Sequence, residues 1–296
     1  MSRDVVALVS ADDFTGAVRV YADRVHDLLR RGGVGSDDAV RIGQAEALDL
    51  LKTLVRQPDT VVDLAGWWFG RALDAIEHNT GGVCAGGSID AASVLAGTSG
   101  ESGVRAALAT MPAIERDAIV LRDAYDLPTS AVAVALDRDE DTARELVTAG
   151  RLHLVAAYDE RTAPDLTDHV GRAKVDLVSL NDLADGSLES HRAAPLRRHT
   201  DSCPACEDVV ETLAKGRRLA TGLPIVAMPD EAREHLLDVM ATKAAKRLPS
   251  QAKLAAVAEA DRDPGPLVPP MLVVFAVAFA VALGLGIALL GHVTGS

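Results

Sequence analysis

The sequence predicts an all-α protein, and three observations support that prediction. The 296 residues are rich in Ala, Val and Leu, with only 3% aromatic residues and no long alternating Val/Thr/Tyr run. Apolar residues recur at helical spacing, and Ala and unbranched side chains lose least conformational freedom in a helix. Gly-rich and Pro-rich stretches divide the helical segments into blocks. A chain of this length is long enough for two or three compact domains.

The acidic balance of the chain restricts its partners. The formal net charge is −13, from 30 Lys and Arg against 43 Asp and Glu. A free-standing nucleic-acid binder needs positive charge to contact phosphates, so the composition argues against one. A subunit docked on a larger nucleic-acid machine escapes this objection, because its partner can supply the basic channel. No Ser/His/Asp set, phosphate-binding glycine loop or paired-carboxylate cleft stands out, so the sequence does not predict an enzyme.

Residues 271–290, MLVVFAVAFAVALGLGIALL, form an uncharged apolar run. A helix of this length spans about 30 Å, the thickness of a bilayer's hydrocarbon core, whereas a buried core helix is rarely so long or so uniformly apolar. Basic residues precede the run, and the tail after it has no Lys or Arg. The sequence therefore predicts one transmembrane helix in the cytoplasmic membrane. The positive-inside rule orients it with the N-terminal bulk in the cytoplasm and the short tail outside. Three cysteines and an N-terminus without an export segment agree with a cytoplasmic location.

Composition also divides the residues before this run into segments. We expect a helical block within residues 1–78, a flexible Gly/Ser/Ala-rich linker over 79–100, a second helical block over 101–158, a third over 165–222, and a juxtamembrane helix with a Pro-rich linker over 223–270.

The second block predicts two short helices joined by a tight polar turn. We expect these helices over residues 129–135 and from residue 140 onward, with the turn at 136–139. This is the helix-turn-helix pattern, whose second helix can lie in a DNA major groove. A plain three-helix bundle is the structural alternative.

The residues of this block resemble region 4 of the extracytoplasmic-function sigma factors of the sigma-70 family. The resemblance rests on Met111-Pro112, on IVLR at 119–122 and on AVAVAL at 131–136. It implies a recognition helix that reads promoter DNA, with contacts from Thr142, Arg144 and Arg151. The block holds six Arg against ten Asp and Glu, so its own affinity for DNA phosphates should be weak.

The first block resembles region 2 of the same family. Asp38, Ile42 and Gln44 fall on the helix that, in the family, docks on the clamp of core RNA polymerase. Trp67 and Trp68 fall beside the promoter −10 strand, where unpaired bases stack on aromatic rings for about 1–3 kcal/mol each. The alternative is that these aromatics are core residues. Three adjacent residues on a helix cannot share one face, so at least one of Trp67, Trp68 and Phe69 should be exposed or at an interface.

His199, Cys203 and Cys206 form an HxxxCxxC run. A His and a Cys four residues apart share a helical face, and the CxxC pair directs two thiolates toward one ion. Zinc takes four nitrogen or sulfur ligands in a tetrahedron, and in a reducing cytoplasm such a cluster is more often a metal site than a disulfide. The alternative is a pair of buried cysteines without a metal. We expect Cys84, in the linker, to be simply a small side chain.

The segment around this run is similar to zinc-binding anti-sigma domains, which also have a helix end like LADGSL at 183–188 before the motif. In that family a fourth ligand lies upstream of the motif, where this chain has Ala173 and Lys174. The nearest candidate is His169, and His191 is less well placed. Two possibilities stay open: a zinc site completed by His169, or the fold without the metal.

Together the resemblances imply a membrane-tethered sigma factor that directs core RNA polymerase to promoter DNA and is held inactive in cis by its anti-sigma-like domain. An intramolecular inhibitor acts at a high effective concentration, so modest contacts suffice. Activation would need a change at the zinc site, a conformational change, or cleavage by a protease within residues 223–266. The alternatives are a degenerate membrane-bound interaction protein without promoter recognition, and a thiol redox sensor in which Cys203 and Cys206 lose zinc and pair.

Overall fold

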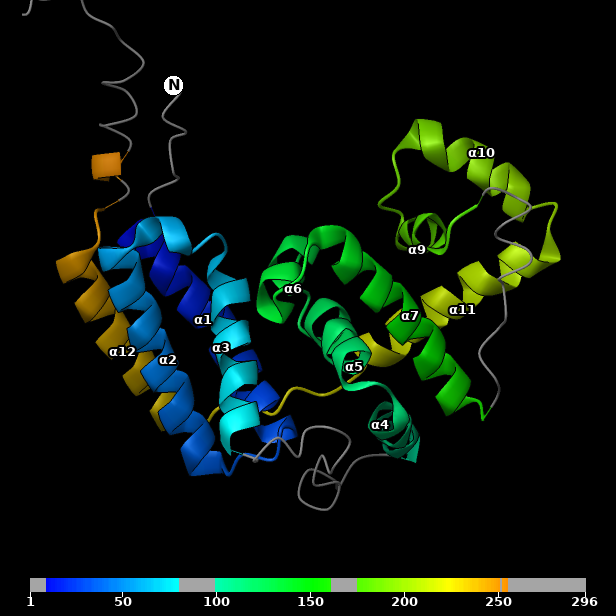
Figure 1. The fold of residues 1–296 in the computed structure, drawn as a ribbon. Helices are drawn as coiled ribbons and strands as arrows, with labels where there is room; N and C mark the ends of the chain where they lie inside the picture. The colour runs from blue at the N-terminus through cyan, green and yellow to red at the C-terminus, as the bar shows by residue number, and fades with distance from the viewer. Residues whose placement is uncertain (1–8, 80–98, 161–174, 251, 255–296) are drawn as a thin grey trace, which may run out of the picture. The chain divides into compact units, whose positions relative to one another are not determined.

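The computed structural model describes residues 9–79, 99–160, 175–250 and 252–254. Within these ranges the regular structure comprises eleven α-helices, two short irregular helical turns and no strand (Figure 1), which confirms the all-α prediction. The described residues up to Leu248 form one compact unit. No helix in the described ranges is both long and apolar enough to cross a membrane. The predicted transmembrane helix at 271–290, His169, Cys84 and most of the predicted linker lie outside the described residues.

Helices α1 (Ala11–Arg31), α2 (Ser36–Arg56) and α3 (Leu64–Asn79) form an N-terminal bundle. Ser10 begins α1 with a capping box: its hydroxyl accepts from the Asp13 backbone N–H at 3.0 Å, and the Asp13 carboxylate accepts from the Ser10 N–H. Gly32 caps the end of α1, and a short connection leads from it to α2. The largest fully buried side chains of the bundle are Phe14, Leu29, Leu50, Leu51, Trp68 and Phe69.

Helices α4 (Ser99–Thr110), α5 (Ala113–Ile119), α6 (Thr129–Leu136) and α7 (Glu140–Tyr158) form a central bundle. The chain turns from α6 into α7 through Asp137, whose φ of 53° is left-handed, and Asp139, whose carboxylate caps α7. This is the predicted connection. Helix α5 ends at Ile119 and continues directly as a π-helical turn, Val120–Ala124.

The two bundles share one hydrophobic core because α3 packs closely on α6. The contact is made by small residues. A Cβ atom on Gly66 would lie 2.6 Å from the Ala131 carbonyl oxygen, and one on Gly70 would lie 3.2 Å from that of Ala135. Next to them the ring of Phe69 stacks on Tyr125 of the central bundle at a centroid distance of 5.5 Å. A bulkier residue at position 66 would force the helices apart.

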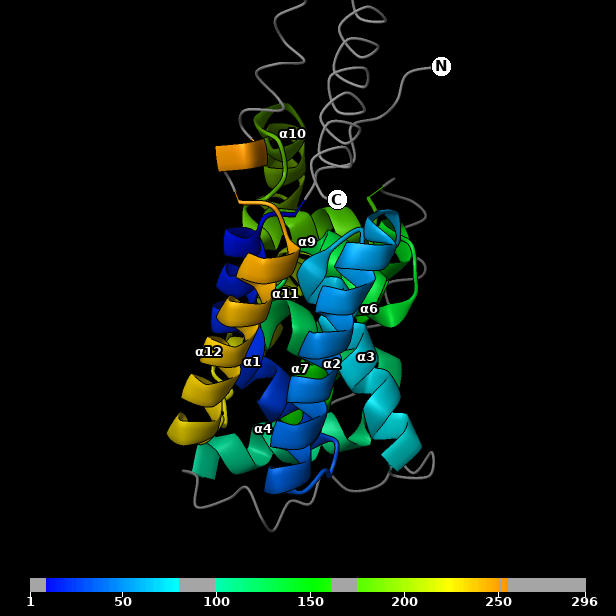
Figure 2. The ribbon, with the colours of Figure 1, turned by 90° about the vertical axis from the view of Figure 1, so that its left-hand side faces the viewer.

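Helices α9 (Leu177–Asp185), α10 (Ser190–Thr200) and α11 (Pro204–Thr221) form a third group, which we call the cysteine module. Helix α11 packs on both α9 and α7. Residues 223–229, which we call the strap, then run back to the N-terminal bundle. There α12 (Asp230–Arg247) packs along α1 and α2 (Figure 2).

Candidate functional site

The HxxxCxxC residues meet where two helices of the cysteine module join. His199 lies in the last turn of α10, and Cys203 is the N-terminal capping residue of α11. Pro204 takes the first position of α11, where its missing N–H leaves no helical hydrogen bond unmade. Cys206 lies in the first turn of α11 and is buried. The tight turn between α10 and α11 thus brings the three side chains together.

The distances between the three ligand atoms fit a zinc ion. One nitrogen of His199 and the sulfur atoms of Cys203 and Cys206 all lie within 4.8 Å of one another. The Nε2 atom of His199 is 3.3 Å from the Cys206 sulfur. In a tetrahedral site with Zn–S bonds of about 2.3 Å and Zn–N bonds of about 2.0 Å, neighbouring ligand atoms lie about 3.5–3.8 Å apart. A small closure of the turn would suffice, so these residues could hold such an ion.

The Cys206 thiol needs a nearby cation to ionise at neutral pH. Burial raises the pKa of the Cys206 thiol to about 11, and the neighbouring Cys203 acts in the same direction. In the absence of a metal, Cys206 is therefore protonated at neutral pH. A zinc ion favours the thiolate instead, so its binding would release protons.

Cys206 also belongs to the small apolar core that joins the cysteine module to the central bundle. Its buried neighbours come from α7, α9 and α11, and are Leu152, Leu180, Val209 and Leu213. A metal bound at Cys206 would therefore fix the α10–α11 turn against the surface that contacts α7.

The described residues supply three of the four ligands that zinc prefers. His191 is 74% exposed and pairs with Glu189 at 3.4 Å, so it does not join the cluster. The predicted fourth ligand, His169, lies outside the described residues.

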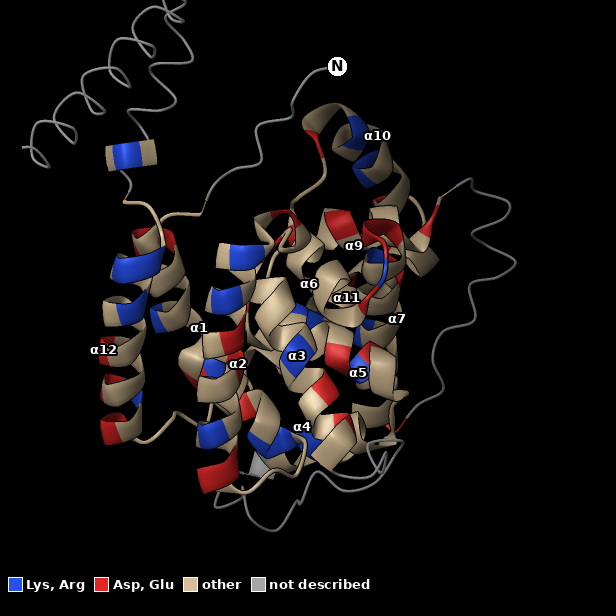
Figure 3. Cartoon of the chain, turned by 60° about the vertical axis from the view of Figure 1, so that its left-hand side comes forward, with Lys and Arg blue, Asp and Glu red and all other residues tan. Residues whose placement is uncertain are grey.

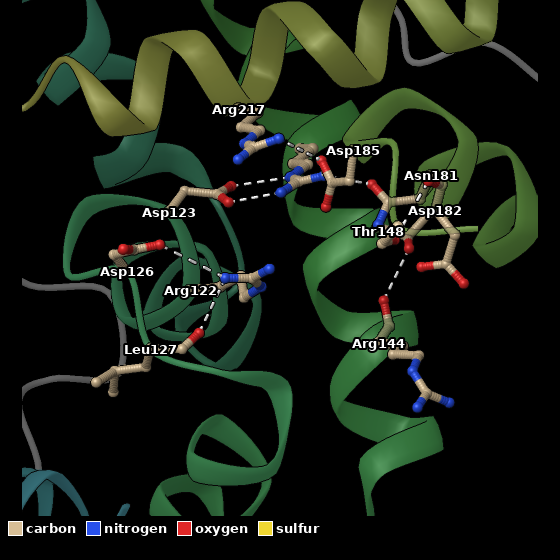
Figure 4. A network of polar contacts seen from close by, with 12 residues as sticks. Arg122, Asp123, Asp126, Leu127, Arg144, Thr148, Asn181, Asp182, Asp185 and Arg217 are labelled. Carbon is tan, nitrogen blue, oxygen red and sulfur yellow. Dashed lines mark hydrogen bonds and ion pairs between the residues drawn. The ribbon is translucent and has the colours of Figure 1, made fainter. Parts of the chain in front are cut away.

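A second polar centre lies where the cysteine module meets α7. The guanidinium of Arg151 is fully buried and donates to both oxygens of Asp123, at 2.8 and 2.5 Å. It also donates to Asn181 at 2.7 Å and to Asp185 at 2.8 Å, both on α9. Arg217 of α11 reaches Asp185 from the half-exposed side at 3.2 Å. Figure 4 shows these groups converging from α7, α9, α11 and the π-helical turn.

The charges of this centre depend on one another. Burial alone would lower the pKa of Arg151, but its bonds to Asp123 and Asp185 outweigh burial and raise it. Burial raises the pKa of Asp123, although Arg151 opposes that rise. The arginine is therefore the group that favours an ionised Asp123 in this buried position.

The predicted recognition helix is α7, and its three predicted DNA-contacting residues lie in different surroundings. The backbone N–H and hydroxyl of Thr142 donate to the capping carboxylate of Asp139 at 2.8 and 2.9 Å. Arg144 is part-exposed and pairs with Asp141 of its own helix at 2.8 Å. Arg151 is buried against α9. In this conformation all three are engaged within the chain.

The two tryptophans of α3 differ in how far their side chains are buried. Trp68 is 1% exposed and part of the core, as is Phe69, whereas Trp67 is half-buried with Arg71 over its ring at 5.9 Å. The expectation that the three aromatics cannot share one face is confirmed. A base could stack on Trp67 in this arrangement, but not on Trp68.

The predicted polymerase-binding residues lie on α2. Asp38 is exposed and pairs with Arg41 at 2.9 Å. Ile42 is buried, and Gln44 is half-buried. Only Asp38 and part of Gln44 are available to a partner here.

Sequence reasoning missed the residues that tie the groups of helices together, which are Asp27, Asp123, Tyr125, Asn181 and Asp185. The bonds that they make between groups of helices span 28 to 199 residues of the chain, so no local spacing signals them.

Removal of one thiol should abolish tight zinc binding. We expect about one zinc per chain, and an affinity for zinc that falls by more than about 100-fold in Cys206→Ala, because even second-shell changes cost 10–100-fold. The affinity should also fall as the pH is lowered, since protons compete for the thiolates. Competition with a chromophoric chelator measures this. Cys84→Ala is the matched control, and equal zinc affinity in the two variants would refute a site at Cys206.

Comparison with known proteins finds no matching family model, no similar curated protein and no similar solved structure. The fold and the site therefore have to be interpreted from the residues of this chain itself.

Proposed function

We propose that this chain is a membrane-tethered sigma factor held inactive in cis by its own zinc-binding anti-sigma-like module. One observation carries the proposal: the C-terminal helices cover both N-terminal groups of helices. Helices α9 and α11 pack on α7, and α12 packs on α1 and α2. In this proposal the N-terminal bundle corresponds to region 2 and the central bundle to region 4, and neither acts while it is covered.

The contact with α7 supports masking of the proposed recognition helix. Gly216 of α11 lies against the backbone of Arg151, and a Cβ there would be 2.6 Å from the Arg151 carbonyl oxygen. The carboxylate of Asp185 occupies the Arg151 guanidinium, as a DNA phosphate would. Lys215 of α11 adds an ion pair with Asp159, just beyond α7, at 2.6 Å.

The contact with α2 supports masking of the proposed polymerase-binding helix. Gly43 stands between Ile42 and Gln44 in the sequence. The Met228 methyl group lies 4.0 Å from the position that a Cβ atom on Gly43 would take. Met228 is itself buried, so the end of the strap, just before α12, covers this part of α2.

The remaining parts of the proposal concern anchorage and release. Residues 271–290 would anchor the chain in the membrane, with the described helices in the cytoplasm. Release would follow cleavage by a protease within residues 223–266, or a change at His199, Cys203 and Cys206. The proposed partners are core RNA polymerase and promoter DNA, and no catalytic activity is proposed.

The test compares binding of core RNA polymerase by residues 1–160 and by residues 1–266. We expect tight binding by the short form and binding at least about tenfold weaker by the long form, because an intramolecular inhibitor acts at a high effective concentration. If neither form binds, the sigma-factor proposal fails. Equal binding by both forms would refute inhibition in cis.

The net charge of −13 favours one second candidate, a membrane-bound interaction protein that keeps the folds without promoter recognition. Figure 3 shows Asp and Glu interspersed with Lys and Arg along the helices. Failure of both fragments to bind polymerase would support this candidate. A thiol redox sensor instead predicts that peroxide releases zinc and increases polymerase binding together.

A further inference from the structure

The strap is held by hydrogen bonds to its backbone as well as by two buried side chains, Leu223 and Met228. Side chains of α1 bind main-chain groups at every second strap residue. The Arg31 guanidinium donates to the Pro224 carbonyl at 2.6 Å, and the Val226 N–H donates to Asp27 at 2.9 Å. Asp23, one helical turn before Asp27, accepts from the N–H of Met228 at 3.1 Å. His26, next to Asp27, contacts the Val226 carbonyl oxygen at 3.1 Å.

The spacing of these contacts has a geometric cause. Two residues of extended chain advance about 6.6 Å, and four residues of α-helix advance about 6.0 Å. Residues two apart in the strap therefore match residues four apart on α1, with the strap antiparallel to the helix. These hydrogen bonds involve only main-chain groups of the strap, so they do not depend on which side chains the strap carries. The buried side chains of Leu223 and Met228 add apolar contacts.

Asp27 is the point where the strap meets both bundles. Its carboxylate is fully buried and accepts three hydrogen bonds from three parts of the chain. Arg31 of α1 donates at 2.6 Å and Tyr125 of the central bundle at 2.7 Å, both to Oδ2, and the strap N–H of Val226 donates to Oδ1.

Tyr125 is placed to donate its hydroxyl proton to Asp27. It is fully buried, and its ring stacks on Phe69 of α3, so it belongs to the contact between the two bundles. Burial raises the pKa of Tyr125 well above its ordinary value, and the Asp27 carboxylate acts in the same direction. The phenol therefore stays protonated, and its O–H group donates a hydrogen bond to Asp27.

We propose that Asp27 couples two events: docking of the strap on α1, and closure of the N-terminal bundle onto the central bundle. A buried carboxylate needs its donors, because each lost hydrogen bond leaves charge without compensation. Removal of the strap N–H weakens the site that Tyr125 binds, and opening of the bundles weakens the site that the strap binds. Each event thus favours the other by the same free energy.

The consequence is a release route independent of the metal centre. Cutting or displacing the strap loosens the α3–α6 contact even if His199, Cys203 and Cys206 are unchanged. The inference adds a mechanism to the proposed function, but its test needs neither polymerase nor DNA, so the two can fail separately.

Hydrogen exchange of the full chain tests the coupling. Tyr125→Phe removes one hydroxyl that donates to Asp27 rather than to the strap, yet we expect it to speed exchange of the Val226 and Met228 amides by about tenfold. Tyr21→Phe is the matched control, because Tyr21 also packs on Phe69, edge-on at 5.9 Å, and should leave strap exchange unchanged. Unchanged strap exchange in Tyr125→Phe overturns the proposal. An equal acceleration in α9–α11 also overturns it, since that would be general destabilisation.

A second variant tests the carboxylate itself. Asp27→Asn leaves one accepting oxygen and should both speed strap exchange and shift tryptophan emission to the red. The chain has two tryptophans, Trp67 and Trp68, and both are on α3, the helix that packs on α6. Faster strap exchange without any change in emission would show that the strap and the closure are not coupled, and would overturn the proposal.

Discussion

Replacing Arg151 by Ala is expected to lower the free energy of unfolding by about 3–5 kcal/mol, the usual cost of removing one partner of a buried ion pair. The variant leaves Asp123 buried without its bidentate partner, and removes the donor that Asp185 and Asn181 share. It also deletes a link between α7 and α9. Urea denaturation of the full chain, followed by far-UV circular dichroism, measures the change.

Arg217→Ala is the matched control for this prediction. Arg217 pairs with the same Asp185 carboxylate, but it is 44% exposed, so its loss should cost only about 0–1 kcal/mol. If the two variants lose the same stability, burial is not what gives the Arg151 cluster its strength.

The cost of Arg151→Ala should also depend on pH. Burial raises the pKa of Asp123 in the folded protein, and removal of Arg151 takes away the group that opposes the rise. A carboxyl with a folded-state pKa above its unfolded value of about 3.9 favours folding when protonated. That contribution is lost as the pH rises through the folded pKa. The difference in stability between the variant and the native protein should therefore widen as the pH rises above the unfolded value of about 3.9, and a constant difference would contradict this account.

Gly216→Ala is expected to destabilise the chain by about 1–3 kcal/mol, the typical cost of overpacking. The added Cβ would lie 2.6 Å from the carbonyl oxygen of Arg151 and 2.9 Å from its Cβ. Both neighbours belong to or adjoin the backbone of α7, so α11 has to move away. Loss of this contact should show as faster hydrogen exchange in α11 and as a lower urea midpoint.

Gly16→Ala provides the opposite outcome for the same chemical change. Gly16 is in α1, and a Cβ there meets nothing within 4 Å. Since Ala favours a helix over Gly, this variant should be more stable by about 0.5–1 kcal/mol. Destabilisation by both substitutions would mean that close packing of α11 on α7 is not the cause.

Gly216→Ala should also loosen the cysteine module from the proposed recognition helix, because Gly216 lies against Arg151 of α7. If the module inhibits in cis, Gly216→Ala should increase polymerase binding by the full chain, while Gly16→Ala should leave it unchanged. If polymerase binding increases in both variants or in neither, the α7–α11 contact contributes to stability but not to the proposed inhibition.

The helices were predictable because their signals are local. Asp139 precedes an apolar period and caps α7, and the glycines after α1 end that helix. The cluster of His199, Cys203 and Cys206 was predictable for the same reason, since all three residues lie within one turn between two helices. The π-helical turn at Val120–Ala124 was missed because it differs from an α-helix by one residue per turn, which leaves no mark on apolar spacing.

What the sequence by itself determined was the all-α class, the two short helices joined by a tight turn, and a cluster of three residues that could hold a metal ion. Only the tertiary structure decided which polar residues became buried partners. Arg151 meets Asp185, and Asp27 meets both Tyr125 and the strap, across separations of 34, 98 and 199 residues. Such pairs follow from the packing of whole helices, in which Gly66 and Gly216 admit close approach. Burial then makes each charge depend on its partner, and no local pattern in the sequence encodes that dependence.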